Sequence, residues 1–253
     1  MSRFTRKIQL KNKNPVQVVI LAAGASARTQ SYEPRCLLKY KGKTILEHQL
    51  AAIERHVPKS EVSVVGGTER NKFLKRLDRK IRFIENVNHH ATNSGESMRL
   101  GFNHSLFDQF LFVHGDLILD EDIFRKINFD KSFVLVDSTG QIASKEVGVT
   151  SIDGNLSIFC YNMPVKWCQI AFLCQRETKI FERMLWKDNF DTTHLLSFEV
   201  INAIVENGGV FDCIDVKNKF IREIDSLKDI PNENTSRTFD NKLANTNVKT
   251  PRD

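Results

Sequence analysis

The sequence lacks any apolar run long enough to cross a membrane. A bilayer-spanning helix needs about 20 consecutive apolar residues, whereas the longest run here, from Val16 to Ala27, is interrupted by Gln17, Gly24 and Ser26. The N-terminal segment is basic but is not followed by an apolar stretch, and neither a myristoylation nor a prenylation signal is present. We therefore expect a cytoplasmic protein with no transmembrane segment.

The sequence also lacks a CxxC cysteine pair and a recognisable pairing of a catalytic nucleophile with a general base. Its five cysteines include no CxxC pair and show no metal-ligand spacing, which argues against a disulfide framework and a zinc site. We expect each thiol to be a small buried side chain in a reducing compartment. No convincing Ser/His/Asp or Cys/His arrangement is present. The cysteines are Cys36, Cys160, Cys168, Cys174 and Cys213.

The formal net charge of +6 is confined to the ends of the chain. Residues 1–14 contain five basic residues and no acid, residues 231–253 have a small basic excess, and residues 15–230 contain equal numbers of acids and bases. We therefore expect no nucleic-acid partner for the body of the protein. The alternative is that the basic N-terminal arm binds nucleic acid or an anionic membrane.

From Val16 to Gly115, short buried runs alternate with segments of helical periodicity. This alternation predicts parallel strands joined by helices that cover both faces of a doubly wound α/β sheet. We expect strands at 16–23, 61–67, 81–87 and 109–115 and helices at 43–56, 70–79 and 94–107. The whole chain is predicted to have a basic flexible arm (1–14), one domain (15–230) and a disordered tail (231–253) that is rich in Asn and Thr.

The second half of the domain reads differently, because short strands follow one another with no long helix between them. This pattern predicts a mixed-sheet insert in a mostly parallel sheet, not a second domain. We expect strands at 133–136, 147–150, 157–161, 170–173, 210–216 and 220–224, with helices at 123–127, 179–187 and 193–206.

A loop of small residues follows the first strand. Leu21, Ala22, Ala23, Gly24, Ala25 and Ser26 lead to Arg28. Small side chains let backbone N–H groups approach an anion closely, and ligands in open α/β sheets bind beyond the carboxyl ends of the strands. Arg28 offers a planar cation for phosphate. Neither a GxGxxG fingerprint nor a P-loop is present, and the alternative is a tight turn packed with alanines.

The stretch from Leu21 to Leu50 resembles the signature LAAGxGxR…PKxL…GKxxL of nucleotidyltransferases, including the MobA-like and sugar-phosphate members. The resemblance implies a Rossmann-like fold of the nucleotidyltransferase or GT-A-like kind, in which an NTP and a phosphorylated acceptor react with release of pyrophosphate. It assigns catalytic roles to Arg28 and Arg35. Ser26 and Arg35 depart from the family's Gly and Lys, and Arg and Lys differ in reach and geometry.

The same resemblance implies a magnesium site on two carboxylates. Asp116 ends a buried strand at the ligand edge of the sheet, and Asp225 matches the first acid of the family's "IDtpeDL" segment. Mg²⁺ usually takes one or two carboxylates plus substrate phosphates and water. The alternatives are that each aspartate caps a following helix, Asp225 one that starts at Ser226.

Three further positions carry expectations. Ser94 and Ser97 could cap a helix or contact the nucleotide base, as the family's "NxxxSL" loop does. Glu199 matches the acceptor side of the family's "EdalN" helix, but a solvated helix face is equally compatible. His89 and His90 invite a metal interpretation; adjacent residues on a strand point to opposite faces, so a loop role is favoured.

These features together predict a nucleotidyltransferase of nucleotide-sugar biosynthesis or a related pathway. Its expected substrates are an NTP, CTP or UTP first, and a sugar 1-phosphate or small alcohol phosphate. The alternatives are a non-catalytic nucleotide-binding relative and a GT-A-type glycosyltransferase. The sequence does not determine the oligomeric state.

Overall fold

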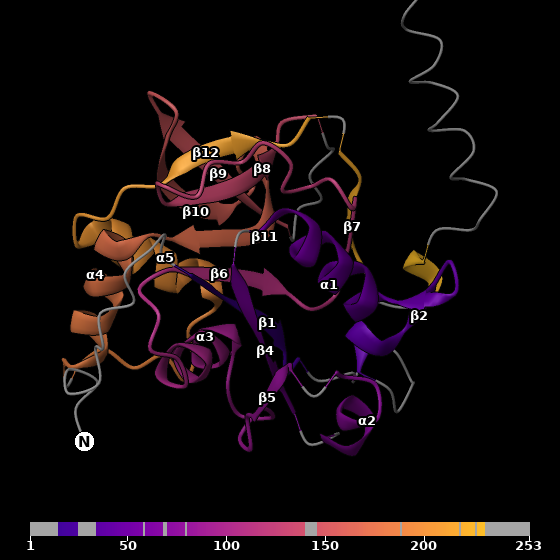
Figure 1. Cartoon of the computed structure of the whole chain (residues 1–253). Coiled ribbons are helices and arrows are strands. Elements are labelled where there is room, and N and C mark those ends of the chain that lie inside the picture. The colour runs from indigo at the N-terminus through magenta and orange to yellow at the C-terminus, as the bar shows by residue number, and fades with distance from the viewer. Residues whose placement is uncertain are drawn as a thin grey trace, which may run out of the picture.

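The structure is a computed structural model in which one mixed sheet is covered by helices on both faces (Figure 1). The predicted arm and tail, and the loop residues Ala25, Ser26 and Arg28, lie outside the described residues. The structure describes residues 15–24, 34–57, 59–67, 70–78, 80–139, 146–187, 189–217, 219–225 and 227–230.

The first half of the sheet is parallel, as the alternating pattern predicts. Its strands lie in the order β5-β4-β1-β6, with β1 between β4 and β6. The connections are helical, which parallel strands require. The strands are β5 (Arg82–Glu85), β4 (Ser60–Gly66), β1 (Val16–Ala22) and β6 (Phe110–His114), and the helices are α1 (Ile45–His56), α2 (Arg70–Leu74) and α3 (Ser94–Asn103).

The second half of the sheet is largely antiparallel and continues the order from β6 as β11-β8-β12-β10-β9. β11 runs antiparallel to both β6 and β8, so it joins the two halves. The mixed-sheet prediction is confirmed, although antiparallel pairing extends further than the sequence suggested. The strands are β8 (Phe133–Asp137), β9 (Val147–Ile152), β10 (Asn155–Tyr161), β11 (Val165–Leu173) and β12 (Asp212–Asp215).

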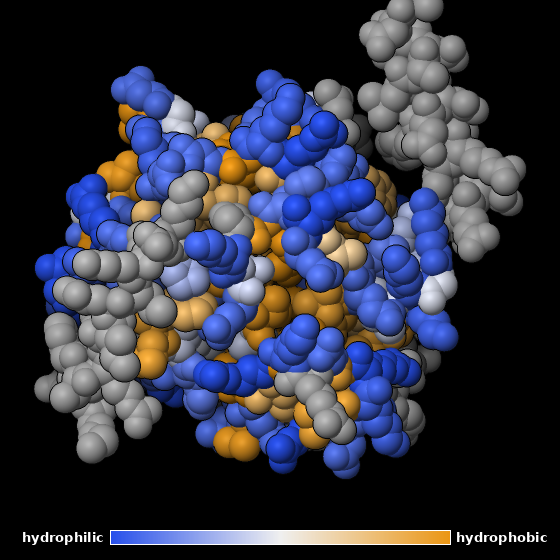
Figure 2. Space-filling model, viewed as in Figure 1, coloured by the Kyte–Doolittle hydropathy of each residue, from blue (hydrophilic) through white to orange (hydrophobic). Residues whose placement is uncertain are grey.

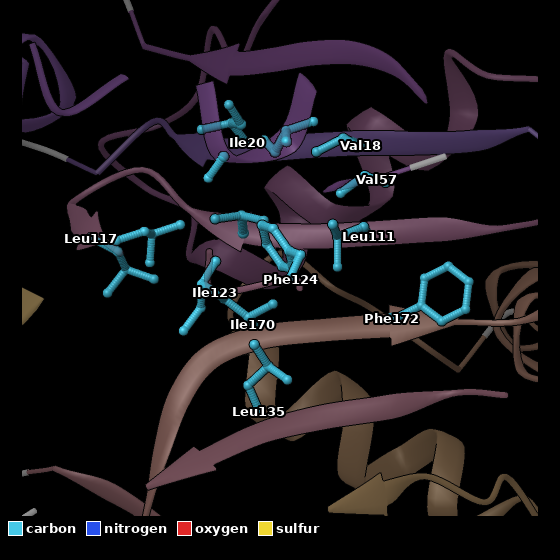
Figure 3. Close-up of a cluster of buried hydrophobic side chains, with 14 of the residues drawn as sticks. Val18, Ile20, Val57, Leu111, Leu117, Ile123, Phe124, Leu135, Ile170 and Phe172 are labelled. Carbon is cyan, nitrogen blue, oxygen red and sulfur yellow. The ribbon is translucent and has the colours of Figure 1, made fainter. Parts of the chain in front are cut away.

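Alternate residues of β1 pack into two separate hydrophobic cores. Val18 and Ile20 belong to the core under α1 and α2, and Figure 3 shows this core crossing β1, β6, β11 and β8. Val19 and Leu21 belong to the opposite core, under α3, α4 (Gln175–Leu185) and α5 (Ser197–Glu206). The period of two along a strand thus explains why β1 has no polar face to expose.

The outer surface of α1 is polar. Figure 2 shows hydrophilic residues over much of the visible surface, with hydrophobic ones grouped between them. Glu47, Glu54 and Arg55 are exposed on α1, whereas Leu46 and Ile53 are buried in the core. Among the described residues, no helix has the length and apolarity needed to cross a membrane.

A capping box fixes the start of α1. The Glu47 amide donates to Thr44 Oγ1 (3.1 Å), and the Thr44 amide donates to the Glu47 carboxylate (2.6 Å). These bonds to Thr44 lower the pKa of Glu47. The stabilisation is therefore complete above the pKa of an unfolded glutamate and is lost as the pH falls through the lowered value.

Thr44→Ala is expected to lower the free energy of unfolding by about 1 kcal/mol, because the first turn of α1 loses its side-chain acceptor. Urea denaturation at neutral pH measures this change. The same comparison at a pH below the lowered pKa of Glu47, where the carboxylate takes up its proton, should give a smaller difference. Equal losses at both pH values would contradict the coupling of Thr44 to Glu47.

One predicted helix is absent. Residues 121–126 form turns, in which the Asp122 amide donates to the Asp120 carboxylate (2.8 Å), and the expected helix at 123–127 does not form. Residues Leu117–Leu119 form a short strand instead, β7, which pairs antiparallel with β13 (Ile221–Glu223). Ile123 and Phe124 are buried in the core, so tertiary burial outweighs the weak helical pattern of this segment.

Candidate active site

A cleft of about 960 Å³ opens at the carboxyl ends of β1 and β6. Ala22, Ala23 and Gly24 border it after β1, and Gly115 and Asp116 border it after β6. This is the edge at which open α/β sheets bind ligands, and the volume is in the range of small-molecule sites. The sequence prediction that the loop after the first strand faces a ligand site therefore has the geometry it requires.

Close backbone packing at this edge depends on two glycines. The Gly115 amide donates to the Leu21 carbonyl (2.9 Å), and a Cβ at Gly115 would lie 2.9 Å from the Ala22 Cβ. A Cβ at Gly24 would lie 3.0 Å from Nη2 of Arg35. The small residues thus let the Arg35 side chain reach the end of β1.

Arg35 lies between the two carboxylates predicted to bind a metal. Its Nη1 is 2.8 Å from Asp116 Oδ2 and 3.0 Å from Asp225 Oδ1. The Arg35 and Asp116 side chains retain only 21% and 13% of their exposure, so this ion pair is partly shielded from solvent. Asp225 is more open, at 56%. The three side chains form the charged centre of the cleft.

Pairing of β7 with β13 brings Asp116 and Asp225 together. Glu223 in β13 is opposite Leu117 in β7, and the Ile224 amide donates to the Asp116 carbonyl (2.9 Å). Asp116 therefore leads into a strand, not a helix. Asp225 precedes a single 3₁₀ turn, Leu227–Asp229.

The carboxylates fit a hard divalent cation. Asp116 Oδ1 is buried and has no hydrogen-bond partner, so one oxygen of this pair is left for a ligand. No group of three or more His, Cys, Asp or Glu side chains within the described residues is arranged to hold a metal. Two carboxylates still suit Mg²⁺, because substrate phosphates and water complete its octahedron.

The N-termini of α3 and α5 meet at another wall of the cleft. Ser94 and Ser97 both border the cleft, but neither caps α3. Ser94 Oγ instead accepts from the Ser197 amide in the first turn of α5 (2.8 Å), and Ser197 Oγ contacts His114 Nε2 (2.7 Å). Burial lowers the pKa of His114, so the imidazole is neutral at neutral pH.

Another part of the cleft wall carries an ion pair and a hydrogen bond that the sequence did not reveal. Lys166 forms an ion pair with Glu146, and the Gln169 amide donates to the Glu223 carboxylate; all four residues border the cleft. Burial, followed by the charges of Asp116 and Asp225, raises the pKa of Glu223 to about 7. No sequence signal marked these residues, because they come from separate strands and loops.

Glu199 lies outside the wall of the cleft. Its carboxylate accepts a hydrogen bond from the Leu196 amide (2.7 Å) at the start of α5. The preceding residues Ser197 and Phe198 border the cleft, whereas Glu199 does not. The Glu199 carboxylate therefore caps α5 in this structure. Neither interpretation from the sequence, an acceptor contact or a solvated helix face, predicted this contact.

His89 and His90 occupy a turn at the rim of the cleft, as the loop interpretation predicted. Their rings lie 3.7 Å apart, so the expectation of opposite directions, which assumed a strand, does not apply. Burial, and then the neighbouring His90, lower the pKa of His89. Both histidines border the cleft near Asn86 and Thr92.

The cysteines are all free thiols with different environments. Cys36 and Cys168 are buried, and burial raises the pKa of Cys168 to about 12 and that of Cys36 further. Cys174 and Cys213 are partly buried, and Cys160 is exposed. The prediction of a buried hydrophobic role is therefore confirmed for Cys36 and Cys168 and is wrong for Cys160.

Comparison with known proteins identifies the same class of domain that the loop residues resemble. Residues 18–128 match the family of the MobA-like NTP transferase domain. The chain is 31% identical over 140 residues to the bifunctional protein GlmU of Methanococcus vannielii, and 30% identical over 102 residues to GlmU of Francisella philomiragia. These alignments cover 53% and 40% of this chain but only 33% and 22% of those proteins.

Solved structures with the same fold extend over nearly the whole chain. The inositol-1-phosphate CTP transferase of T. maritima has a TM-score of 0.70 at 17% identity and covers 92% of this chain and 98% of its own. The CTP:phosphocholine cytidylyltransferase LicC of Streptococcus pneumoniae has a TM-score of 0.71 at 16% identity. The match covers 90% of this chain and 99% of LicC. At such low identity these similarities establish the fold.

Proposed function

We propose that this chain transfers the nucleotidyl group of an NTP to a phosphorylated small molecule. Its residues 18–128 match the MobA-like NTP transferase domain, which supports this class of reaction. The expected nucleotides are CTP or UTP, and the expected acceptor is a sugar 1-phosphate or a small alcohol phosphate. The observation that carries the proposal is the convergence of the loop after β1, Arg35, Asp116 and Asp225 in one cleft.

Each part of the cleft suits one part of this reaction. Backbone N–H groups of the loop that begins at Ala22 would hold the triphosphate, aided by Arg35 and by Arg28, which lies outside the described residues. The N-terminus of α3, whose first turn contains Ser94 and Ser97, would face the nucleotide. Glu199 caps α5 and does not border the cleft, so it has no place in the proposed acceptor site.

The chemistry needs no general base from the protein. An oxygen of the acceptor phosphate attacks the α-phosphorus of the NTP, a new P–O bond forms, and the bond to the bridging oxygen breaks so that pyrophosphate leaves. A phosphate monoester has a second pKa of about 6 and is already a dianion near neutral pH. Catalysis is then positioning and electrostatic stabilisation.

A divalent cation has a defined place in this proposal. Asp116 and Asp225 would hold Mg²⁺, which would supply positive charge to the phosphate oxygens when it is bound. Arg35 neutralises the same two carboxylates in this structure, so its guanidinium is positioned to exchange between carboxylate and phosphate partners.

A matrix of pyrophosphate-release assays tests the proposed function. The four NTPs are each combined with a panel of sugar 1-phosphates and alcohol phosphates, with and without Mg²⁺. We expect release that depends on an acceptor and on the metal, with CTP or UTP preferred. Nucleotide binding without release for every pair would identify a non-catalytic relative, and hydrolysis or transfer from a nucleotide sugar would identify a glycosyltransferase.

A further inference from the structure

A β-bulge in β11 directs one side chain into the cleft. The pairing of β11 with β8 passes from Trp167 opposite Val136 to Ala171 opposite Val134, so residues 168–170 of β11 are opposite a single residue. Bulges of this kind redirect side chains and are frequent near active sites. Gln169, at the centre of this bulge, borders the cleft.

Gln169 adopts a backbone conformation that its residue type disfavours. Its φ is +57°, in the left-handed region that non-glycine residues enter only at a cost. Its side chain donates to Glu223 in β13, the strand that positions Asp225. Strained residues of this kind cluster at functional sites, and the amide of Gln169 ends in the cleft.

Lys166, three residues before Gln169, forms a second pair on the same wall. Its ammonium contacts Glu146, and both side chains keep about a quarter of their exposure, 23% and 26%. The wall beyond the charged centre therefore alternates donors and acceptors: an ammonium, a carboxylate, an amide and a second carboxylate. Hydroxyl groups both donate and accept, so a ligand with several hydroxyls can bond to each pair without breaking it.

The aromatic residues of this wall do not form a cage for a fixed cation. Trp167 is 3% exposed, and its indole N–H donates to the Ile170 carbonyl. Phe198 is buried, whereas Tyr161 keeps 42% of its exposure. A quaternary ammonium group needs several open ring faces and forms no hydrogen bonds. The Lys166 ammonium would also repel it.

We propose that Gln169 is a specificity-determining residue for the acceptor, and that the acceptor is a polyhydroxylated monophosphate, a sugar or polyol phosphate, which the pairs Gln169–Glu223 and Lys166–Glu146 recognise through its hydroxyls. This inference rests on the proposed function, since it assigns the wall beyond Asp116 and Asp225 to the acceptor. It excludes phosphocholine as the preferred substrate.

Two variants of Gln169 separate recognition from backbone strain. Gln169→Asn keeps the amide and tolerates a positive φ but is one methylene shorter, so it cannot reach Glu223 in the same way. Gln169→Gly removes the side chain and relieves the strain. The matched control is Lys126→Gly, because Lys126 also has a positive φ (66°) but lies on an exposed turn away from the cleft.

We expect both Gln169 variants to raise KM for a sugar or polyol phosphate about tenfold, the effect of one lost hydrogen-bonding partner. The KM for the NTP should stay within about twofold of wild type, on the same scale. Gln169→Gly should melt within a few degrees of wild type, because the strain that glycine relieves offsets the lost hydrogen bond to Glu223. Lys126→Gly should leave both KM values unchanged.

The outcomes separate this inference from the proposed function. An unchanged acceptor KM in both Gln169 variants, or a wild-type preference for phosphocholine over every polyol phosphate, would overturn the inference while leaving a nucleotidyltransferase. If wild type releases no pyrophosphate with any pair, the proposed function fails. Calorimetric titration with the polyol monophosphates then decides the inference: binding that Gln169→Gly abolishes supports it, and no binding overturns it.

Discussion

Replacing Asp116 with asparagine is expected to lower the rate of pyrophosphate release by about 10²–10³-fold, the loss typical of removing one preorganised charge contact in an active site. Asparagine has nearly the same shape as aspartate but lacks the negative charge that a divalent cation needs. The substituted side chain is the one whose Oδ1 is buried without a partner. The cost should therefore fall on turnover, with little effect on folding.

The fold should survive this change for two reasons. The backbone of residue 116 keeps its bond from the Ile224 amide, and Arg35 keeps its contact with Asp225. Thermal melting by circular dichroism should shift by only a few degrees, roughly 2–4 °C for each kcal/mol in a domain of this size. Asp122→Asn is the matched control, because Asp122 accepts a hydrogen bond from His56 and does not border the cleft.

The assignment of Asp116 makes a definite claim about the metal. Raising the Mg²⁺ concentration should restore little activity in Asp116→Asn, since a metal ligand is missing. Asp122→Asn should need no more Mg²⁺ than wild type. Wild-type turnover in Asp116→Asn would exclude this carboxylate from the metal site and leave the cleft without its proposed electrostatic centre.

Replacing Arg35 with methionine is expected to have the second large effect, and it should act on stability as well as on activity. Without the guanidinium, Asp116 and Asp225 lose the cation that lies between them and repel each other. For a partly shielded pair of this kind the loss is about 2 kcal/mol, between the values of surface and buried ion pairs, or a fall in Tm of roughly 4–8 °C.

Magnesium should repair the stability of this variant. In the wild type a bound cation would compete with Arg35 for the carboxylates, whereas in Arg35→Met the pair would be vacant and the cation would replace the lost charge. Millimolar MgCl₂ should therefore raise Tm more in Arg35→Met than in wild type. Arg35→Lys keeps the positive charge but lacks the planar guanidinium, so its rise in Tm with MgCl₂ should lie between those of wild type and Arg35→Met.

Activity should separate the roles of Arg35 further. If its guanidinium also binds the triphosphate, Arg35→Met should lower kcat/KM for the NTP by about 10²-fold even at saturating Mg²⁺. Full activity at saturating metal would show that Arg35 only balances the carboxylates. A Tm of Arg35→Met that is unaffected by Mg²⁺ would contradict the shared site.

Much of the first half of the fold was predictable from local pattern. Continuous apolar runs predicted β1 and β6 because strands covered on both faces have no polar side, and a strand-like pattern predicted β4. The periodicity after Lys43 predicted α1, which in the structure starts at Ile45 behind the capping box of Thr44 and Glu47. The prediction was wrong at residues 117–127, where short apolar segments are equally compatible with a strand, a turn or a helix.

The candidate site was only half visible in the sequence. The loop after β1 and the position of Asp116 follow from local order, because both come directly after a buried strand. Glu199 matched a familiar segment, yet its carboxylate caps α5. The wall formed by Lys166 and Gln169 gave no signal, because the bulge that directs Gln169 depends on how β11 pairs with its neighbours.

By itself, the sequence determined the alternation of strands and helices, the small-residue loop and the acid at the end of β6, because each depends on residues that are close in the chain. Only the tertiary structure decided that Arg35 meets Asp225, 190 residues away, and that both meet Asp116. The reason is non-local pairing. β7 and β13 are three residues each, too short to predict alone, and their antiparallel register brings the two carboxylates to one guanidinium.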